Sequence, residues 1–242
     1  FILFIIIIYF SVGFYLAHTI LRIDHSCGAH EGSLPNTWST NVNYPDIKNK
    51  KRINLRQSFD YTKYQLSKWE NVNFPSRDHN ITISGWLFNY HNNKPIVIIV
   101  HGLFPNGKCK SEPNLIASLL VKNEINALTI DLRNYGQSSL VSHYDNLGLT
   151  EYNDVLGAFD FLQTKGFKKN QIGLLGISLG ASTAIFAASH EHKINAIWSE
   201  SSLAEFEMIL TDEIKRYGFP NIFNFAVSIA GRLLTGKDPT AL

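Results

Sequence analysis

The residues with the clearest capacity for chemistry lie in Gln171–Ser189, which is QIGLLGISLGASTAIFAAS. Ser178 stands between Gly176 and Gly180, after an apolar run of strand length and before small and apolar residues that suit a buried helix. This is the G-x-S-x-G nucleophile-elbow pattern, in which a sharp turn lifts the serine hydroxyl clear of a sheet. The neighbouring chain comes so close there that the flanking positions must be glycine. Ser178 is therefore predicted to be a nucleophile; the alternative is a chance serine in a buried strand–helix pair.

A second stretch directly follows the short apolar run PIVIIV and contains His101, Gly102 and Leu103. In open α/β sheets the functional loops lie at the carboxyl ends of the strands. We expect the Leu103 N–H to face Ser178 together with the Leu179 N–H, which makes an oxyanion hole. One such donor typically lowers the barrier by about 3 kcal/mol. The His101 side chain is expected only to fix this loop.

The elements that must position these residues alternate along the chain. Runs of strand length occur at 72–75, 81–88, 95–100, 127–130, 172–177 and 194–198. Helical patterns begin with predicted N-caps at Ser111 and Thr150 and extend to Asn123 and Gly166. This alternation predicts an α/β fold, with a mostly parallel central sheet that carries helices on both faces.

Three motifs occur together: VHG at 100–102, DLRNYGQS at 131–138 and GISLG at 176–180. In this order and spacing they resemble the α/β-hydrolase superfamily. Within it, the sequence is similar to serine-aminopeptidase-like and monoacylglycerol-lipase-like hydrolases, some of which carry one N-terminal membrane anchor. The resemblance runs from about Asn71 to the end of the chain.

The resemblance implies a Ser–acid–His triad with Ser178 as nucleophile, and Leu103 and Leu179 as oxyanion donors. Asp131 belongs to the loop motif and is not the triad acid in this family. Asn134 departs from the small residue or glycine that is usual there, which we interpret as variation that the loop tolerates.

The family places the acid and the histidine after the serine. Only His190 and His192 follow Ser178, and a helix of about 12 residues rises about 18 Å, which carries them away. We expect both on the surface. Glu200 is a possible acid, and otherwise a structural or loop carboxylate.

Two helices with apolar faces are predicted at 203–217 and 222–234. They suit either a lid or acyl pocket, or helices that pack on the sheet. Residues 236–239 then resemble the segment that precedes the family's next strand. We therefore expect the triad histidine to lie beyond Leu242, and these residues alone to have little or no hydrolase activity.

The N-terminal residues 1–21 contain no acid, lysine or arginine and are long enough to span a bilayer. We expect a transmembrane anchor, a juxtamembrane connector at 22–65 and a hydrolase domain at 66–242 that is truncated before its last strands. The missing initiator methionine indicates truncation at this end also. Asn80-Ile81-Thr82 is a glycosylation sequon, usable only on a lumenal or extracellular domain. The side of the membrane stays open.

Composition excludes several classes of protein. The net charge of +2, from 22 basic and 20 acidic residues, gives no electrostatic case for a nucleic-acid partner. Hydrophobic residues at 45% exclude general disorder. The two cysteines, Cys27 and Cys109, cannot by themselves form a disulfide framework or a metal site. We expect no metal and no cofactor, and a small-molecule or lipid-like acyl substrate.

Two other functions stay open. The stretch GLFPNGKC at 102–109 differs by one residue from a phosphate loop, but Cys109 replaces the hydroxyl that binds Mg²⁺ and Pro105 removes a backbone donor. The chain also fits a membrane-anchored binding module that keeps the fold without a working triad.

Overall fold

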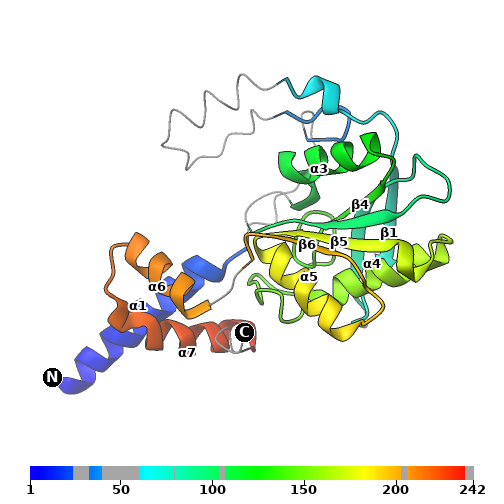
Figure 1. Cartoon of the computed structure of the whole chain (residues 1–242). Helices are drawn as coiled ribbons and strands as arrows, with labels where there is room; N and C mark the ends of the chain where they lie inside the picture. The colour runs from blue at the N-terminus through cyan, green and yellow to red at the C-terminus, as the bar shows by residue number, and fades with distance from the viewer. Residues whose placement is uncertain (24–32, 40–59, 79, 104–106, 203–205, 238–242) are drawn as a thin grey trace.

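The computed structural model describes residues 1–23, 33–39, 60–78, 80–103, 107–202 and 206–237. Its centre is a mixed sheet with the strand order β1-β2-β4-β3-β5-β6 (Figure 1). β2 is antiparallel to β1 and β4, whereas β4, β3, β5 and β6 run parallel. The mostly parallel sheet of the sequence prediction is thus confirmed. The strands are β1 (Glu70–Pro75), β2 (Thr82–Phe88), β3 (Ile96–Val100), β4 (Asn126–Ile130), β5 (Ile172–Ile177) and β6 (Ile197–Glu200).

Helices cover both faces of the sheet, as predicted (Figure 1). One face carries α3, whose Ala117 packs in a cluster with Ile99 of β3. The other face carries α4 and α5, whose apolar residues join a separate and larger cluster. These helices are α3 (Ser111–Lys122), α4 (Tyr152–Thr164) and α5 (Leu179–His190).

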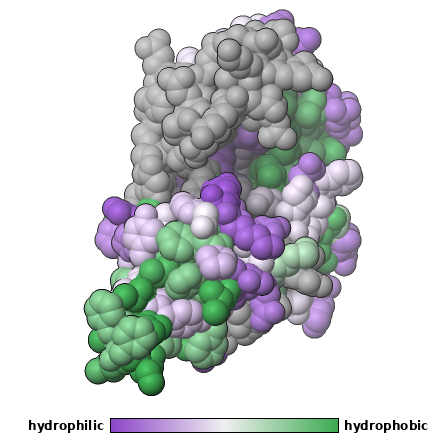
Figure 2. Space-filling view, turned by 90° about the vertical axis from the view of Figure 1, so that its left-hand side faces the viewer, coloured by the Kyte–Doolittle hydropathy of each residue, from purple (hydrophilic) through white to green (hydrophobic). Residues whose placement is uncertain are grey.

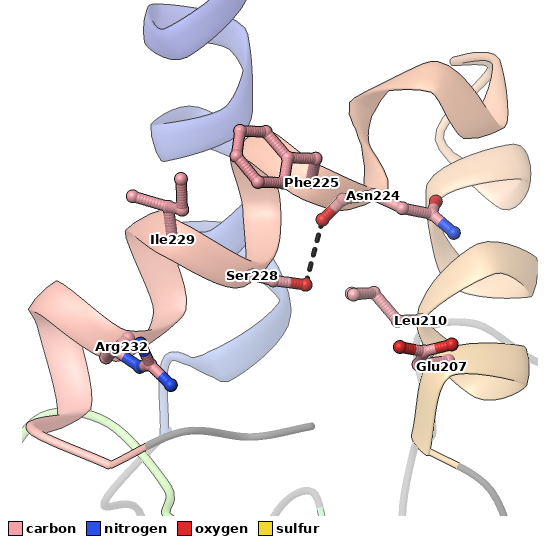
Figure 3. Close-up of a pocket in the computed structure, with 7 residues that line it drawn as sticks. All are labelled: Glu207, Leu210, Asn224, Phe225, Ser228, Ile229 and Arg232. Carbon is pink, nitrogen blue, oxygen red and sulfur yellow. Dashed lines mark hydrogen bonds between the residues drawn. The ribbon is translucent and has the colours of Figure 1, made fainter. Parts of the chain in front are cut away.

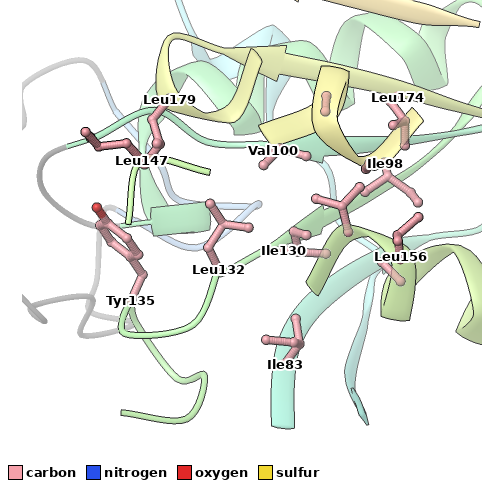
Figure 4. Close-up of a cluster of buried hydrophobic side chains, with 14 of the residues drawn as sticks. Ile83, Ile98, Val100, Ile130, Leu132, Tyr135, Leu147, Leu156, Leu174 and Leu179 are labelled. Atoms are coloured by element: carbon pink, nitrogen blue, oxygen red, sulfur yellow. The ribbon is translucent and has the colours of Figure 1, made fainter. Parts of the chain in front are cut away.

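Aliphatic side chains fill the layer between the sheet and α4 and α5 (Figure 4). Val100 of β3, Leu174 of β5 and Leu156 of α4 are all buried there. Fully burying one such side chain contributes about 1.5–3 kcal/mol. The cluster continues to Leu147 and Leu179, so the packed core reaches the start of α5, directly behind Ser178.

Strand β5 has the bounds that the sequence predicts, whereas β6 begins three residues later than the predicted 194. The apolar run at 194–198 predicts a strand that starts too early. Ile194 belongs to a turn after α5, because its N–H bonds to the Glu191 carbonyl.

Both N-cap predictions are wrong, because Lys110 and Glu151 occupy the N-cap positions of α3 and α4. Ser111 already lies inside α3, and the Thr150 hydroxyl donates to the Glu151 carboxylate. That buried carboxylate accepts the Gly148 N–H at 3.0 Å and so organises the turn before α4.

The N-terminal helix α1 (Ile2–Leu21) is long and apolar enough to cross a membrane. The core helix of a soluble protein and a signal sequence share these properties. Its second half packs within the molecule, where Leu16 and Ala17 are fully buried. Gly13 allows close packing on α7 (Asn224–Thr235), because an added Cβ would lie 2.4 Å from the Ala226 Cβ.

The first half of α1 is exposed, with residues 1–8 between 46% and 98% accessible. These side chains form the apolar end of the molecule at the bottom of Figure 2. Ile222, Phe225 and Leu233 of the adjoining turn and α7 are also exposed. α1, α7 and α6 (Phe206–Arg216) lie together to one side of the sheet (Figure 1).

The described parts of the predicted connector pack against the residues that follow it. The Leu66 N–H donates to the Pro35 carbonyl at 2.8 Å, and Trp38 is buried. At the end of α1, the Ile23 N–H donates to the His143 carbonyl at 3.0 Å.

Cys109 is buried and disulfide-bonded. Four sites named in the sequence predictions lie outside the described residues: Cys27, Pro105, Leu203 where a helix was predicted to begin, and residues 238–239.

A buried ion pair joins the loop after β3 to the end of β4. Lys108 and Asp131 are both inaccessible to solvent and form a salt bridge. The Lys108 ammonium also donates to the Ser84 hydroxyl at 3.0 Å and lies 5.3 Å from the Trp86 ring centroid. The Asp131 carboxylate accepts the backbone N–H of Lys108 at 2.7 Å and that of Gln137 at 3.1 Å.

Lys108→Met is expected to lower the free energy of unfolding by about 3–5 kcal/mol, because it leaves the Asp131 carboxylate buried without its cation. Urea denaturation measures the change. Lys94→Met, which breaks the exposed pair with Glu124, is the matched control and should leave the midpoint nearly unchanged. Equal shifts for the two variants would contradict this account.

Candidate active site

The turn between β5 and α5 has the strained geometry that the elbow pattern predicts. Ser178 has φ +53° and ψ −116°, in the left-handed half of backbone space where residues other than glycine are rare. A Cβ on Gly176 would lie 2.1 Å from the Gly180 carbonyl oxygen, and one on Gly180 would lie 2.2 Å from the Val100 oxygen. Both glycines are therefore required by close approach of the main chain.

The parallel register of β3 and β5 brings the loop after β3 to this turn. Val100 lies opposite Gly176, so Gly102, two residues on, lies beside Ser178. A Cβ added to Gly102 would lie 3.2 Å from the Ser178 Cβ. Of the predicted oxyanion donors, Leu179 directly follows Ser178 and Leu103 directly follows Gly102, so they come from the two segments that meet here. Within the described residues neither N–H donates a hydrogen bond.

His101 holds this loop and takes no part as a base. Its Nε2 accepts the Leu132 N–H at 3.1 Å, so its Nδ1 carries the hydrogen that is donated to the Gly102 carbonyl at 2.9 Å. Burial lowers the pKa of His101 to about 3, which keeps the ring neutral. Its side chain fixes the loop, as the sequence predicts.

Asp131 and Asn134 organise the loop after β4. Asp131 forms the ion pair with Lys108, which agrees with the prediction that it is not the triad acid. Asn134 has φ +69°, where Asn is one of the few residues besides glycine that is readily accommodated. Its side-chain oxygen accepts the N–H groups of Val141 and Ser142, both at 2.8 Å. This explains why Asn replaces glycine here.

The remaining candidate residues lie away from the Ser178 hydroxyl or face elsewhere. His190 ends α5 and stacks on Tyr152 at 4.2 Å, and His192 follows it in an exposed turn. Glu200 accepts the Ser178 N–H through its backbone carbonyl at 2.8 Å, but its carboxylate accepts the Trp198 indole N–H at 3.2 Å. Among the described residues, no side chain forms a hydrogen bond with the Ser178 hydroxyl.

Family comparison agrees with this geometry. The alpha/beta hydrolase fold family matches residues 95–238, which is more than half of the chain. The chain belongs to the alpha/beta hydrolase fold family. Thiohydrolase aneE of Aspergillus aculeatus is 30% identical over 126 residues, which are 52% of this chain and 39% of that protein.

Two solved structures show the same fold. An esterase of Pyrococcus furiosus, PF2001, has a TM-score of 0.56 at 22% identity, over 74% of this chain and 66% of that chain. The alpha/beta hydrolase GrgF from Penicillium sp. sh18 has a TM-score of 0.53 at 20% identity, over 71% and 56% of the two chains. This chain therefore spans two fifths to two thirds of the length of these relatives.

Two lysines near the candidate site were not predicted to take part in it. Lys108 was noted only in the phosphate-loop-like stretch, and its burial against Asp131 leaves it unable to hold a phosphate. Lys110 is only 9% exposed, and its ammonium donates to the carbonyl oxygens of Gly102 and Leu103. The sequence signal was two lysines in three residues, directly before a helix.

A buried acidic group that the sequence analysis missed lies behind the site. Burial raises the pKa values of Asp145, Glu151 and Asp154. Asp154 is paired with Arg133 at 2.7 Å, and the Asp145 carboxylate accepts the Tyr135 hydroxyl at 2.9 Å. These contacts fix the segment between β4 and α4, which contains all three acids or leads into them. No group of three or more His, Cys, Asp or Glu in the described parts could hold a metal.

A cavity of about 400 Å³ lies between α6 and α7 (Figure 3). Leu210, Phe225 and Ile229 supply its apolar wall, while Glu207 and Arg232 lie at opposite ends in the view. None of the predicted catalytic residues lines this cavity. The suggestion that the two helices form an acyl pocket therefore stays a prediction.

Gly180→Ala is expected to lower the free energy of unfolding by about 1–3 kcal/mol, because its Cβ would collide with main-chain oxygen. Chemical denaturation measures this loss. Gly173→Ala, in the strand β5 that precedes the turn, is the matched control: its added Cβ would meet nothing closer than 3.5 Å, so the change stays within about 1 kcal/mol. A stable Gly180→Ala protein would show that the turn is not closely packed.

Proposed function

We propose that this chain is a serine hydrolase that cleaves an ester, thioester or amide bond through an acyl-enzyme on Ser178. One observation carries the proposal: a serine held on a strained turn lies beside two backbone N–H donors that bond to no described residue. A turn with a purely structural role would not require a strained serine next to backbone N–H groups without partners.

In the first step, the Ser178 Oγ attacks the substrate carbonyl carbon and the carbonyl oxygen becomes negative. The Leu103 and Leu179 N–H groups donate to that oxygen. Leu179 begins α5, whose first N–H groups have no partner within the helix and favour negative charge. The leaving group departs with a proton, and water then cleaves the acyl-enzyme.

A serine hydroxyl near neutral pH is a weak nucleophile until a base takes its proton. His101 cannot be that base, because both of its ring nitrogens are bonded inside the protein. The proposal therefore includes a histidine and an acid supplied from outside the described residues. The sequence analysis named one candidate acid, Glu200. Its carboxylate accepts the Trp198 indole N–H, and the residue is exposed.

The names of similar proteins, a thiohydrolase and an esterase, support a small acyl substrate. The exposed apolar half of α1 supports attachment to a membrane. A lipid-like acyl substrate fits an enzyme that lies at a membrane surface. A thioester, an ester and an amide all present the same carbonyl to Ser178, so the site itself does not choose among them.

A fluorophosphonate probe should label the natural protein on Ser178, because an activated serine attacks its phosphorus. Ser178→Ala should abolish labelling, whereas Ser189→Ala, at the exposed end of α5, should retain it. Peptide mass spectrometry locates the adduct.

A natural protein that folds but resists the probe would contradict the proposal. It would favour the alternative from the sequence analysis, a membrane-anchored binding module that keeps the hydrolase fold without catalysis.

We also propose that the hydrolase domain lies on the oxidising side of the membrane to which α1 attaches it. Cys109 is disulfide-bonded, and disulfides persist mainly in secreted, lumenal and extracellular proteins. Asn80 of the sequon is exposed in the turn between β1 and β2, at φ +64°, where an attached glycan meets no packed surface.

Expression in eukaryotic cells should therefore yield a protein whose apparent mass falls on treatment with peptide-N-glycosidase F. Asn80→Gln should remove this shift. Asn73→Gln, an exposed asparagine of β1 outside any sequon, is the control and should keep it. An unglycosylated protein whose Cys109 alkylates without reductant would place the domain on the reducing side.

A further inference from the structure

Lys110 is a buried cation that bonds to carbonyl oxygens of the predicted oxyanion loop. Its Nζ donates to the Gly102 oxygen at 2.8 Å and to the Leu103 oxygen at 2.9 Å. Within the described residues it forms no salt bridge. Lysine is almost never buried to this degree unless it is paired, so its position beside two carbonyls calls for an explanation.

Those two carbonyls belong to the peptide groups on either side of the Leu103 Cα. In a planar trans peptide, the C=O of one residue and the N–H of the next point in opposite directions. Because Lys110 holds the Gly102 carbonyl, the Leu103 N–H of the same peptide must point away from Lys110. Because Lys110 also holds the Leu103 carbonyl, the following peptide cannot rotate to compensate.

The residue that begins this peptide contacts the elbow. Gly102 lies against the turn, and its added Cβ would be 3.0 Å from the Ile177 oxygen and 3.2 Å from the Ser178 Cβ. His101 Nδ1 also donates to the Gly102 oxygen, but it does not contact the Leu103 oxygen. Only Lys110 therefore bonds to both peptides among the residues described.

We propose that Lys110 is a positioning residue that sets the direction of the Leu103 N–H toward the oxyanion of the reaction on Ser178. This inference rests on the proposed function. Lys110 does not touch the substrate; it acts through the two peptides of Leu103.

A charged lysine suits this role, since charge-assisted hydrogen bonds are about twice as strong as neutral ones. Burial lowers the pKa of Lys110 to about 8, and the nearby Glu112 carboxylate opposes that change. His101 is neutral, and Lys108 is the other cation of this loop, with its charge matched by Asp131.

The test is hydrolysis of p-nitrophenyl acetate by the natural protein and four variants. Lys110→Met is expected to lower kcat by about 10- to 100-fold with less than a threefold change in KM, because a misdirected donor affects the transition state more than the bound ester. Lys122→Met is the matched control. Lys122 ends the same helix and also donates to a carbonyl, that of Lys63, but far from Ser178, so its kcat should not change.

Lys110→Arg separates positioning from folding, because arginine keeps the charge and the donors. It should recover most of the lost kcat, and its rate should not fall above pH 8, where Lys110 loses its proton. A folded Lys110→Met protein with normal kcat would overturn the inference and leave Ser178 as nucleophile intact. An arginine variant that folds but is as slow as the methionine variant would also overturn it. If Ser178→Ala hydrolyses the ester as fast as the natural protein, the proposed function and this inference both fail.

Discussion

The structure depends on one close approach, in which main chain from three elements meets with no side chain between. The end of β3, the end of β5 and the first turn of α5 come so near that Gly180 lies against the Val100 and His101 carbonyls. Any Cβ there would separate the two strand ends. The packed core behind Leu179 holds α5 in this position, and the strain at Ser178 is the result. Hydrophobic burial thus supports a backbone conformation that the local sequence alone would not adopt.

Polar groups then fix the loops that this contact brings together. Lys108, in the loop after β3, forms an ion pair with Asp131 at the end of β4. Lys110 donates a hydrogen bond to the Gly102 carbonyl of the same loop. His101 connects it to Leu132 at the end of β4. A buried charge without such partners would cost several kcal/mol, about 3–5 when one member of an ion pair is lost. These bonds hold the described residues of the loop in place. An oxyanion site requires donors held in this way, because they must already point at the place where charge develops.

Much of this arrangement could be predicted from the sequence. The run before Ser178 predicted strand β5 with its true bounds, and Gly176 and Gly180 are required for the reason expected of them. Short buried strands can be predicted because each is a local apolar run in the sequence. The roles of Lys108 and Lys110 could not be predicted, since their partners are fixed by the fold and a lysine in a loop is usually solvated. The packing of α1 on α7 was missed for the same reason: Gly13 is one small residue in a uniformly apolar helix, and its partner Ala226 lies at the other end of the chain.

The central claim is that Ser178, Leu103 and Leu179 form one acyl-transfer site, and the structure of a phosphonate adduct tests it most directly. A crystal structure of the natural protein after reaction should show phosphorus bonded to the Ser178 Oγ. The account predicts that one phosphonyl oxygen lies about 2.7–3.1 Å from both the Leu103 and Leu179 nitrogens. An adduct on another residue, or a phosphonyl oxygen that contacts neither nitrogen, would contradict it.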